Sequence, residues 1–228
     1  MFGNIKRMLA DIQSEVNYTR SYIGKDALDE RVMDAMARVP RDEFVPDKLK
    51  KEAFNNGPLP IGYNQTISQP YIVALMTDLL DIKPEHRVLE IGTGCGYQTA
   101  ILSQLCTEVY TMERIAELSH LAIEHFIKLK YKNIETTIGN GYDGWPEHAP
   151  YDGIVVTASA SHIPDALTEQ LKPGGNLVIP IGLEGMHQEL LLLKKDLNSE
   201  ITVDSILPVA FVPLIDDKMR HQGNSTLH

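Results

Sequence analysis

The stretch RVLEIGTGCGYQTAILSQL, residues 87–105, decides the fold of this chain. It opens with Val88, Leu89 and Ile91, a short apolar run of the kind that a buried parallel strand needs. Glycines then occupy every second position, and from Tyr97 onward the apolar residues recur at helical spacing. The stretch therefore predicts a strand, a glycine turn and a helix whose free amide groups point at whatever the turn holds.

The glycine pattern separates two classes of cofactor site. A dinucleotide fingerprint requires G-x-G-x-x-G, and counted from Gly92 its third glycine would fall on Tyr97. The chain instead reads E-x-G-x-G-x-G, beginning at Glu90, which disfavours a nicotinamide-dependent oxidoreductase. A second acid, Glu113, follows the next predicted strand, 109–112, about twenty positions after the first glycine. There its carboxylate can accept hydrogen bonds from both hydroxyls of a ribose.

Length and composition are those of a globular α/β protein. The chain has 228 residues, 43% hydrophobic and 23% charged, which suits a single domain, 1–228. The formal net charge of −10 argues against a nucleic-acid partner, because phosphate binding needs a basic face. The two cysteines and eight histidines show no metal-ligand spacing and no disulfide framework, and no signal peptide or membrane span is visible. We therefore expect a cytoplasmic protein without a metal site or membrane contact, and a monomer.

Hydrophobic periodicity predicts the remaining elements. Helices are expected over 5–16, 28–39, 71–80, 114–130 and 163–171, and further strands over 134–138, 151–158, 176–181, 189–193 and 201–207. The last two strands are expected to pair antiparallel at one edge of the sheet.

Three stretches are expected to be irregular. Prolines at both ends of 40–46 predict an extended course, and Pro173–Gly175 should end the helix before it. The stretch 55–70 supports no regular element of useful length, and a loop this long is often functional. The chain thus divides into helices and a loop (1–80), a cofactor-binding core (81–214) and a polar tail (215–228) that we expect to be frayed.

Several strings together resemble one family. The E-x-G-x-G-x-G pattern resembles motif I of S-adenosylmethionine-dependent methyltransferases. PRDEFVP (40–46), QTISQPY (65–71), VLEIGTGCGY (88–97), GWPEHAPYD (144–152), LKPGGNLVIPIG (171–182) and FVPL (211–214) are similar, in this order, to the protein-L-isoaspartate O-methyltransferases. The resemblance covers residues 5–220, and its specific element is QTISQP.

The resemblance implies a fold and a set of site residues. The fold is a doubly wound, Rossmann-like α/β sheet of seven strands, mostly parallel with an antiparallel edge, whose N-terminal helices cover the cleft. The cofactor is S-adenosylmethionine, which leaves as S-adenosylhomocysteine. The expected cofactor-binding residues are Gln65, Thr66, Ile67, Glu90, Gly92, Thr93, Gly94, Gly96, Tyr97, Glu113, Asn140, Gly141 and Thr157. Ser68 is the expected catalytic residue and donates to the substrate carboxylate, while Phe211, Val212, Pro213 and Leu214 border the substrate peptide.

Two positions depart from the family pattern. The strand 134–138 is followed in the family by Gly-Asp-Gly, whose aspartate lies beside the adenine, but this chain has Asn140 there. Its amide keeps an acceptor oxygen, gains a donor and loses the charge, so a hydrogen bond to the adenine amino group is still expected. Where some members have a polar cofactor contact, this chain reads Ile215-Asp216-Asp217.

The expected reaction is methylation of the α-carboxylate of L-isoaspartyl and, less well, D-aspartyl residues in damaged peptides or proteins, with repair through a succinimide. A methyltransferase of the same fold acting on a small molecule and a binding protein without turnover remain open. Ser68 has a second interpretation as a cap for the helix that follows it. Trp145 is interpreted as a packing residue rather than an adenine contact.

Overall fold

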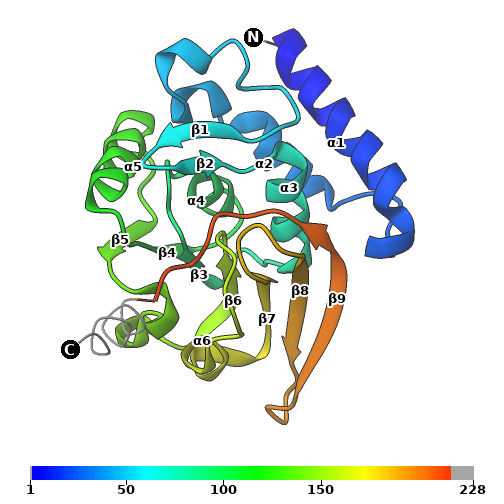
Figure 1. Ribbon diagram of the computed structural model, residues 1–228, viewed down its shortest axis with the longest axis vertical. Helices are drawn as coiled ribbons and strands as arrows, with labels where there is room; N and C mark the ends of the chain where they lie inside the picture. The colour runs from blue at the N-terminus through cyan, green and yellow to red at the C-terminus, as the bar shows by residue number, and fades with distance from the viewer. Residues whose placement is uncertain (1, 217–228) are drawn as a thin grey trace, which may run out of the picture.

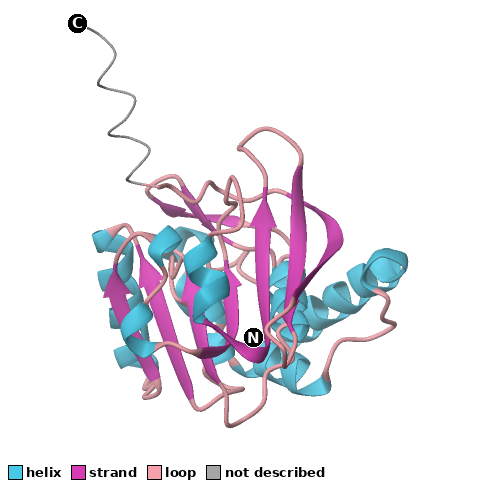
Figure 2. Ribbon diagram, turned by 90° about the horizontal axis from the view of Figure 1, so that it is seen from below, coloured by secondary structure: helices cyan, strands magenta, loops and turns pink. Residues whose placement is uncertain are grey.

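A sheet of seven strands in the order β5-β4-β3-β6-β7-β8-β9 forms the centre of the protein, with helices on both faces (Figures 1 and 2). The computed structural model describes residues 2–216. The strands are β3 (Arg87–Ile91), β4 (Glu108–Glu113), β5 (Ile134–Ile138), β6 (Tyr151–Val156), β7 (Leu171–Ile181), β8 (Gln188–Lys195) and β9 (Ile201–Val209). The first five strands in this order, from β5 across to β7, pair parallel. Strands β8 and β9 add an antiparallel edge. The expected fold class is confirmed.

The two faces of the sheet carry separate cores. The helices are α1 (Phe2–Ile23), α2 (Glu30–Arg38), α3 (Pro70–Leu79), α4 (Tyr97–Leu102), α5 (Ala116–Leu129) and α6 (Asp165–Gln170). Neighbouring residues of a strand point to opposite faces. Val88 accordingly joins the core formed with α1 to α5, while Leu89 joins a smaller core with α6. Because the larger core runs from Met8 to Leu207, we infer that the N-terminal helices and the sheet form one domain.

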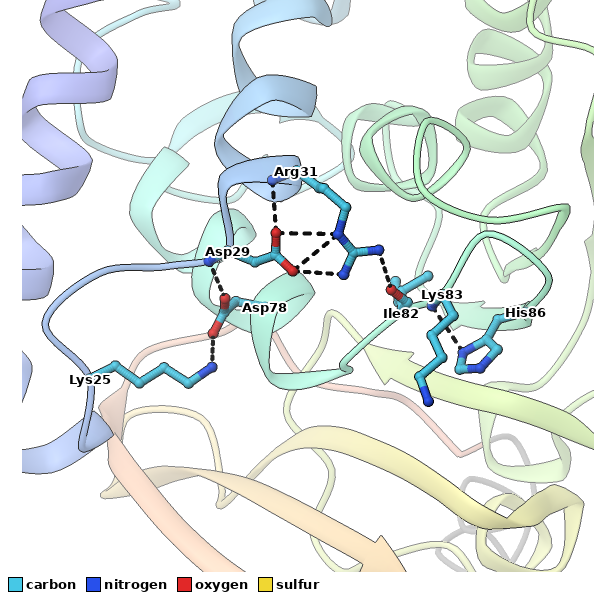
Figure 3. Close-up of polar contacts among 7 residues, drawn as sticks. All are labelled: Lys25, Asp29, Arg31, Asp78, Ile82, Lys83 and His86. Carbon is cyan, nitrogen blue, oxygen red and sulfur yellow. Dashed lines mark hydrogen bonds and ion pairs between the residues drawn. The ribbon is translucent and has the colours of Figure 1, made fainter.

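A polar network joins the start of α2 to α3 and to the stretch that precedes β3 (Figure 3). The buried carboxylate of Asp78, on α3, accepts hydrogen bonds from the Lys25 ammonium and from the Asp29 amide (2.6 Å). Asp29 caps α2 by accepting from the Arg31 amide at 2.8 Å, and the Arg31 guanidinium donates to the Ile82 carbonyl at 3.0 Å. One buried acid thereby fixes where α2 begins relative to α3 and the start of the sheet.

The predicted irregular stretch 55–70 contains a short hairpin, which corrects that expectation. Strands β1 (Leu59–Gly62) and β2 (Gln65–Ile67) pair antiparallel. Tyr63 and Asn64 form the turn, both at positive φ (52° and 57°), the conformation that two-residue hairpin turns require. The usual sequence signal for such a turn is Asn-Gly or Asp-Gly, and Tyr-Asn does not carry it.

Two further expectations are wrong in detail. The stretch 40–46 is not extended, because η1 (Arg41–Phe44) is a 3₁₀ turn, followed by a second, η2 (Asp47–Leu49). Strand β7 begins at Leu171 rather than 176, since Pro173–Gly175 lie in a bulge where the pairing shifts. Among residues 2–216, no helix combines the length and apolar character needed to cross a bilayer. The predicted frayed tail lies, from residue 217 on, outside the described residues.

The order of the strands reverses between β3 and β6, because the chain runs from β3 outward to β5 and then returns to β6. Ligands of open α/β sheets bind at such a switch point, beyond the carboxyl ends of the strands. Here those ends lead into Gly92 and Thr157. After β9 the chain turns back and crosses over this end of the sheet, seen as the red segment in Figure 1.

Candidate active site

The glycine turn lies against the end of β6, at the switch point. Gly92 has φ +98°, and a Cβ atom there would lie 2.4 Å from Thr157 Oγ1. The Thr157 hydroxyl donates to the Gly92 carbonyl at 2.6 Å. At Gly96, with φ +89°, a Cβ atom would meet the Phe126 ring at 2.6 Å. Only glycine fits at these two points, because backbone conformation and close packing each exclude a side chain.

Glu113 ties the glycine turn to helix α5. One carboxylate oxygen accepts from the Gly94 amide at 2.8 Å, and the other accepts from the amides of Arg114 (2.8 Å) and Ile115 (2.9 Å). The last two amides precede α5, where free N–H groups favour an anion. The oxygen that binds Gly94 accepts only this one bond, so it can accept a further hydrogen bond, as from a ribose hydroxyl.

Three adjoining cavities meet at this end of the sheet. The first, which we call the cleft, has a volume of about 80 Å³ and is lined by Gln65, Thr66, Ile91, Gly92, Gly94, Met112, Glu113, Arg114, Ile115, Gly139, Gly141, Thr157, Ala158, Val212, Pro213, Leu214 and Ile215. The second, the inner chamber, has about 40 Å³ between the glycine turn and the stretch 66–68. The third, the outer groove, has about 520 Å³ between α1, the start of α3 and the end of β9.

The residues that line the cleft have the chemistry that the nucleoside part of the expected cofactor needs. Its walls are apolar at Met112, Ile115 and Leu214, and its acid is Glu113. Gly141 leaves the gap between these walls open, since a Cβ atom there would lie 2.4 Å from the Ile91 side chain. A flat apolar slot with a carboxylate at its edge suits adenosine, and the exposed backbone of the glycine turn suits the rest of the cofactor.

The predicted cofactor residues divide among these cavities. Gln65, Thr66, Gly92, Gly94, Glu113, Gly141 and Thr157 line the cleft, while Ile67, Thr93 and Tyr97 line only the inner chamber. Glu90, Gly96 and Asn140 line none of the three. Trp145 packs against Tyr110 and His148 and does not line the cleft. The lining residues Met112 and Ile115 were not predicted, although both lie within two positions of Glu113.

Glu90 is a buried structural acid and not a cleft residue. One carboxylate oxygen accepts from the hydroxyls of Thr99 and Thr111 (2.6 Å to the latter), and the side chain has no exposed surface. Burial away from water raises the pKa of Glu90 to about 8, against an ordinary value of 4.5. The group therefore binds a proton near neutral pH in the folded protein but not in the unfolded chain.

This difference predicts a pH-dependent stability. Between about pH 4.5 and pH 8 the folded state binds the extra proton, so the unfolding free energy falls as the pH rises and levels off above pH 8. Each full unit of pKa difference corresponds to about 1.4 kcal/mol. Glu90→Gln should lose much of this slope in urea unfolding at pH 5.5, 7 and 8.5. The control is Glu108→Gln, because Tyr110 and Arg87 lower the pKa of Glu108. Identical slopes in wild type and Glu90→Gln would refute the prediction.

Ser68 lies between the inner chamber and the outer groove, and it lines both. Helix α3 begins at Pro70 after Gln69, without a side-chain cap, so the alternative of Ser68 as a cap is not what the structure shows. Its hydroxyl has no hydrogen-bond partner within the described part of the chain. The hydroxyl is therefore available to a ligand that bridges the two cavities.

Arg41 holds the backbone of Ser68 in place, and sequence reasoning did not identify it. Its guanidinium donates to the carbonyls of Ser68 and Ala53, both at 2.7 Å, and lies over the Tyr97 ring at 4.7 Å. Burial lowers the pKa of this fully buried side chain, and among residues 2–216 no carboxylate pairs with it. A buried cation in this position joins the loop 55–68 to the helix that follows the glycine turn. The only signal in the sequence was an arginine inside the string PRDEFVP.

Helix α1 flanks the outer groove, and neither α1 nor α2 covers the cleft. Helix α1 contributes Glu15, Tyr18 and Thr19 to the groove, whereas the cleft lining includes no residue of α1 or α2. The β1–β2 hairpin instead borders the cleft through Gln65 and Thr66. The predicted substrate residues lie in a shared wall, because Phe211 and Val212 line the groove and Val212, Pro213 and Leu214 line the cleft.

The comparisons with known proteins agree on one family. The sequence model of the family "Protein-L-isoaspartate(D-aspartate) O-methyltransferase (PCMT)" matches residues 20–219. Protein-L-isoaspartate O-methyltransferase 2 of Polaromonas sp. is 54% identical over 207 residues, covering 91% of this chain and 98% of the relative. The enzyme of the same name from Nitrosococcus oceani is 53% identical over 209 residues, covering 92% and 95%.

Solved structures give the same result. A protein-L-isoaspartate O-methyltransferase superposes with a TM-score of 0.80 at 25% identity, covering 93% of this chain and 66% of the other. A Plasmodium falciparum protein described as a member of this enzyme class, in complex with S-adenosyl-L-homocysteine, superposes with a TM-score of 0.72 at 27% identity, covering 90% and 97%. On the evidence of sequence, fold and site together, this chain belongs to the protein-L-isoaspartate (D-aspartate) O-methyltransferase family.

Proposed function

We propose that this protein transfers a methyl group from S-adenosylmethionine to the α-carboxylate of L-isoaspartyl and, less well, D-aspartyl residues in damaged peptides and proteins. The observation that carries the proposal is the position of Ser68. Its unpaired hydroxyl lies where the inner chamber, lined by the glycine turn, adjoins a groove of about 520 Å³ that is large enough for a peptide segment.

The main task of the protein in this reaction is to position the substrate carboxylate against the methyl group. When bound, S-adenosylmethionine supplies an electrophilic methyl group on a sulfonium and leaves as S-adenosylhomocysteine. A carboxylate is already ionised at neutral pH, so no general base is needed. The barrier lies in aligning the attacking oxygen and removing its water shell.

Each part of the site has a role in that alignment. The Ser68 hydroxyl donates to one carboxylate oxygen of the substrate and thereby selects the oxygen that faces the inner chamber. Glu113 accepts from a ribose hydroxyl, and the glycine turn presents backbone groups to the remaining part of the cofactor. Phe211 and Val212 form the wall that the peptide backbone follows. The resulting methyl ester closes to a succinimide after release, which reopens partly to normal aspartate without the enzyme.

Paired peptides test this function. Two peptides that differ only in isoaspartate against aspartate are incubated with radiolabelled cofactor, and only the isoaspartyl peptide should be methylated. Ser68→Ala should lower kcat by about tenfold to a hundredfold, since one hydrogen bond to a charged group is lost, with cofactor affinity nearly unchanged. Equal labelling of both peptides would instead indicate a small-molecule or unselective methyltransferase. Cofactor binding without any labelling would indicate a binding protein.

We propose a reducing cytoplasm as the setting of the reaction. Both cysteines are buried and free, which suits a reducing cytoplasm. We also propose a monomer that does not bind nucleic acid, because the net charge is −10. Cell fractionation and sedimentation, with and without nucleic acid, check these points.

A further inference from the structure

Asn140 binds protein partners through both the NH₂ group and the oxygen of its side-chain amide. Its Nδ2 donates to Asp216 Oδ1 at 3.2 Å and to Asp143 Oδ2 at 3.3 Å, while its Oδ1 accepts from the Tyr142 amide at 3.3 Å. Two carboxylates on one side and an N–H on the other admit only this orientation of the amide. Its neighbours Gly139 and Gly141 line the cleft, but Asn140 does not. Both polar groups of the side chain that was expected to face adenine thus have protein partners.

Asp216 is the most distant of these partners in sequence. It belongs to the segment 211–216, which we call the strap. Figure 1 shows the strap crossing back from the end of β9 over the carboxyl ends of the central strands. The strap begins at Phe211, whose amide and carbonyl are both bound by the Gln188 side chain (2.6 and 3.1 Å). Backbone hydrogen bonds of 2.8 Å join Ser159 to Val212 and Leu214 in its middle.

The far end of the strap is attached through Asp216. Between these attachments the strap contributes Val212, Pro213, Leu214 and Ile215 to the cleft. The cleft measures about 80 Å³, below the range of about 300–1,000 Å³ that is usual for small-molecule sites. One wall has to move when a nucleoside enters. The strap is a suitable wall, because it is a single irregular segment attached at a few points.

We propose that Asn140 is a positioning residue that fastens the strap over the cleft, by donating to Asp216, and does not act as a direct contact of the adenine. The identity of the residue follows from this role. An aspartate at position 140 would face the carboxylates of Asp143 and Asp216 and would repel the strap. An asparagine joins both acids to the end of strand β5. The proposal depends on the cofactor cleft but not on which carboxylate is methylated.

A swap of the two partners tests the proposal. In Asn140→Asp the strap meets an added carboxylate, whereas in Asn140→Asp/Asp216→Asn the amide lies on the strap and the carboxylate on the sheet, so the hydrogen bond can form again. Asn198→Asp is the matched control, because Asn198 also donates to an aspartate, Asp196 (3.5 Å), but in the exposed turn between β8 and β9. The readouts are the affinity for S-adenosylhomocysteine by calorimetry and hydrogen exchange of the strap amides without ligand.

We expect the single variant to lose cofactor affinity and strap protection, and the double variant to recover both. Asn140→Asp should weaken S-adenosylhomocysteine binding by about tenfold and speed exchange of the Leu214 amide several-fold, and the double variant should recover most of both. Asn198→Asp should match the wild type. Unchanged or tighter binding in Asn140→Asp, unchanged strap exchange, or no recovery in the double variant would each overturn the proposal. Hydrogen exchange is measured without any ligand, so it tests the strap even if the assigned reaction were wrong.

Discussion

Replacement of Glu113 by alanine should weaken S-adenosylhomocysteine binding by about 100-fold or more. The carboxylate accepts three backbone hydrogen bonds and is the acid in the cleft. Hydrogen bonds to a charged group contribute about 1.5–3 kcal/mol each, so the loss of one ribose contact alone weakens binding by about tenfold to a hundredfold. The variant also releases the glycine turn from α5, because the Gly94 amide loses its acceptor. Calorimetric titration measures the effect.

Two further variants make the Glu113 result interpretable. Glu113→Gln keeps one acceptor oxygen but turns an NH₂ group toward an N–H donor or a ribose hydroxyl, so an intermediate loss is expected. Glu117→Ala removes an exposed acid from the first turn of the same helix without touching the glycine turn. It should bind as the wild type does. A Glu113→Ala protein that binds within threefold of wild type would show that the ribose lies elsewhere.

Replacement of Arg41 by methionine should lower kcat for the isoaspartyl peptide by about 100-fold, while S-adenosylhomocysteine affinity falls by less than tenfold. Methionine cannot donate to the carbonyls of Ser68 and Ala53, so the loop that carries the Ser68 hydroxyl loses its anchor. A displacement of about 1 Å at a reacting group can cost about 100-fold in rate. Initial rates over a range of peptide concentrations separate kcat from KM.

The controls for Arg41 address folding and charge. Arg38→Met removes an exposed arginine of α2 whose partner is Asp34, and it should leave kcat unchanged. Arg41→Lys keeps the charge but not the planar fork, so it should recover only part of the rate. Urea unfolding of every variant confirms that the assays use folded protein. If Arg41→Met lowers cofactor affinity and kcat equally, Arg41 supports the whole site rather than Ser68.

The sequence predicted those parts of the site that depend on patterns among neighbouring residues. The glycine turn and Glu113 at the end of its strand follow from short-range patterns, because strand and helix periods and glycine positions are properties of neighbouring residues. The roles of Ser68 and of the substrate-bordering residues 211–214 were assigned only through the resemblance to a family. The hairpin β1–β2 was missed, since its Tyr63-Asn64 turn adopts a conformation that these residues seldom signal.

Three side chains show what local patterns could not reveal. Glu90 shares the glycine motif with cleft residues, yet it faces the threonines of neighbouring elements and not the cleft. Asn140 was expected at the adenine, and the structure shows its amide bound to a residue 76 positions away. Arg41 binds a carbonyl 27 positions away. In each case the deciding partner is distant in sequence, so its identity depends on how the elements pack.

The amino-acid sequence by itself determined the class of the sheet, the position of the cofactor turn and the family to which the chain belongs, because periodicity and motif residues act over a few neighbouring positions. Only the tertiary structure decided which acid reaches the cleft, which side chain binds the loop of Ser68 and which residue pairs with Asp216. Those outcomes depend on contacts between segments far apart in the chain, and a polar side chain takes whichever partner the packing places within hydrogen-bond distance.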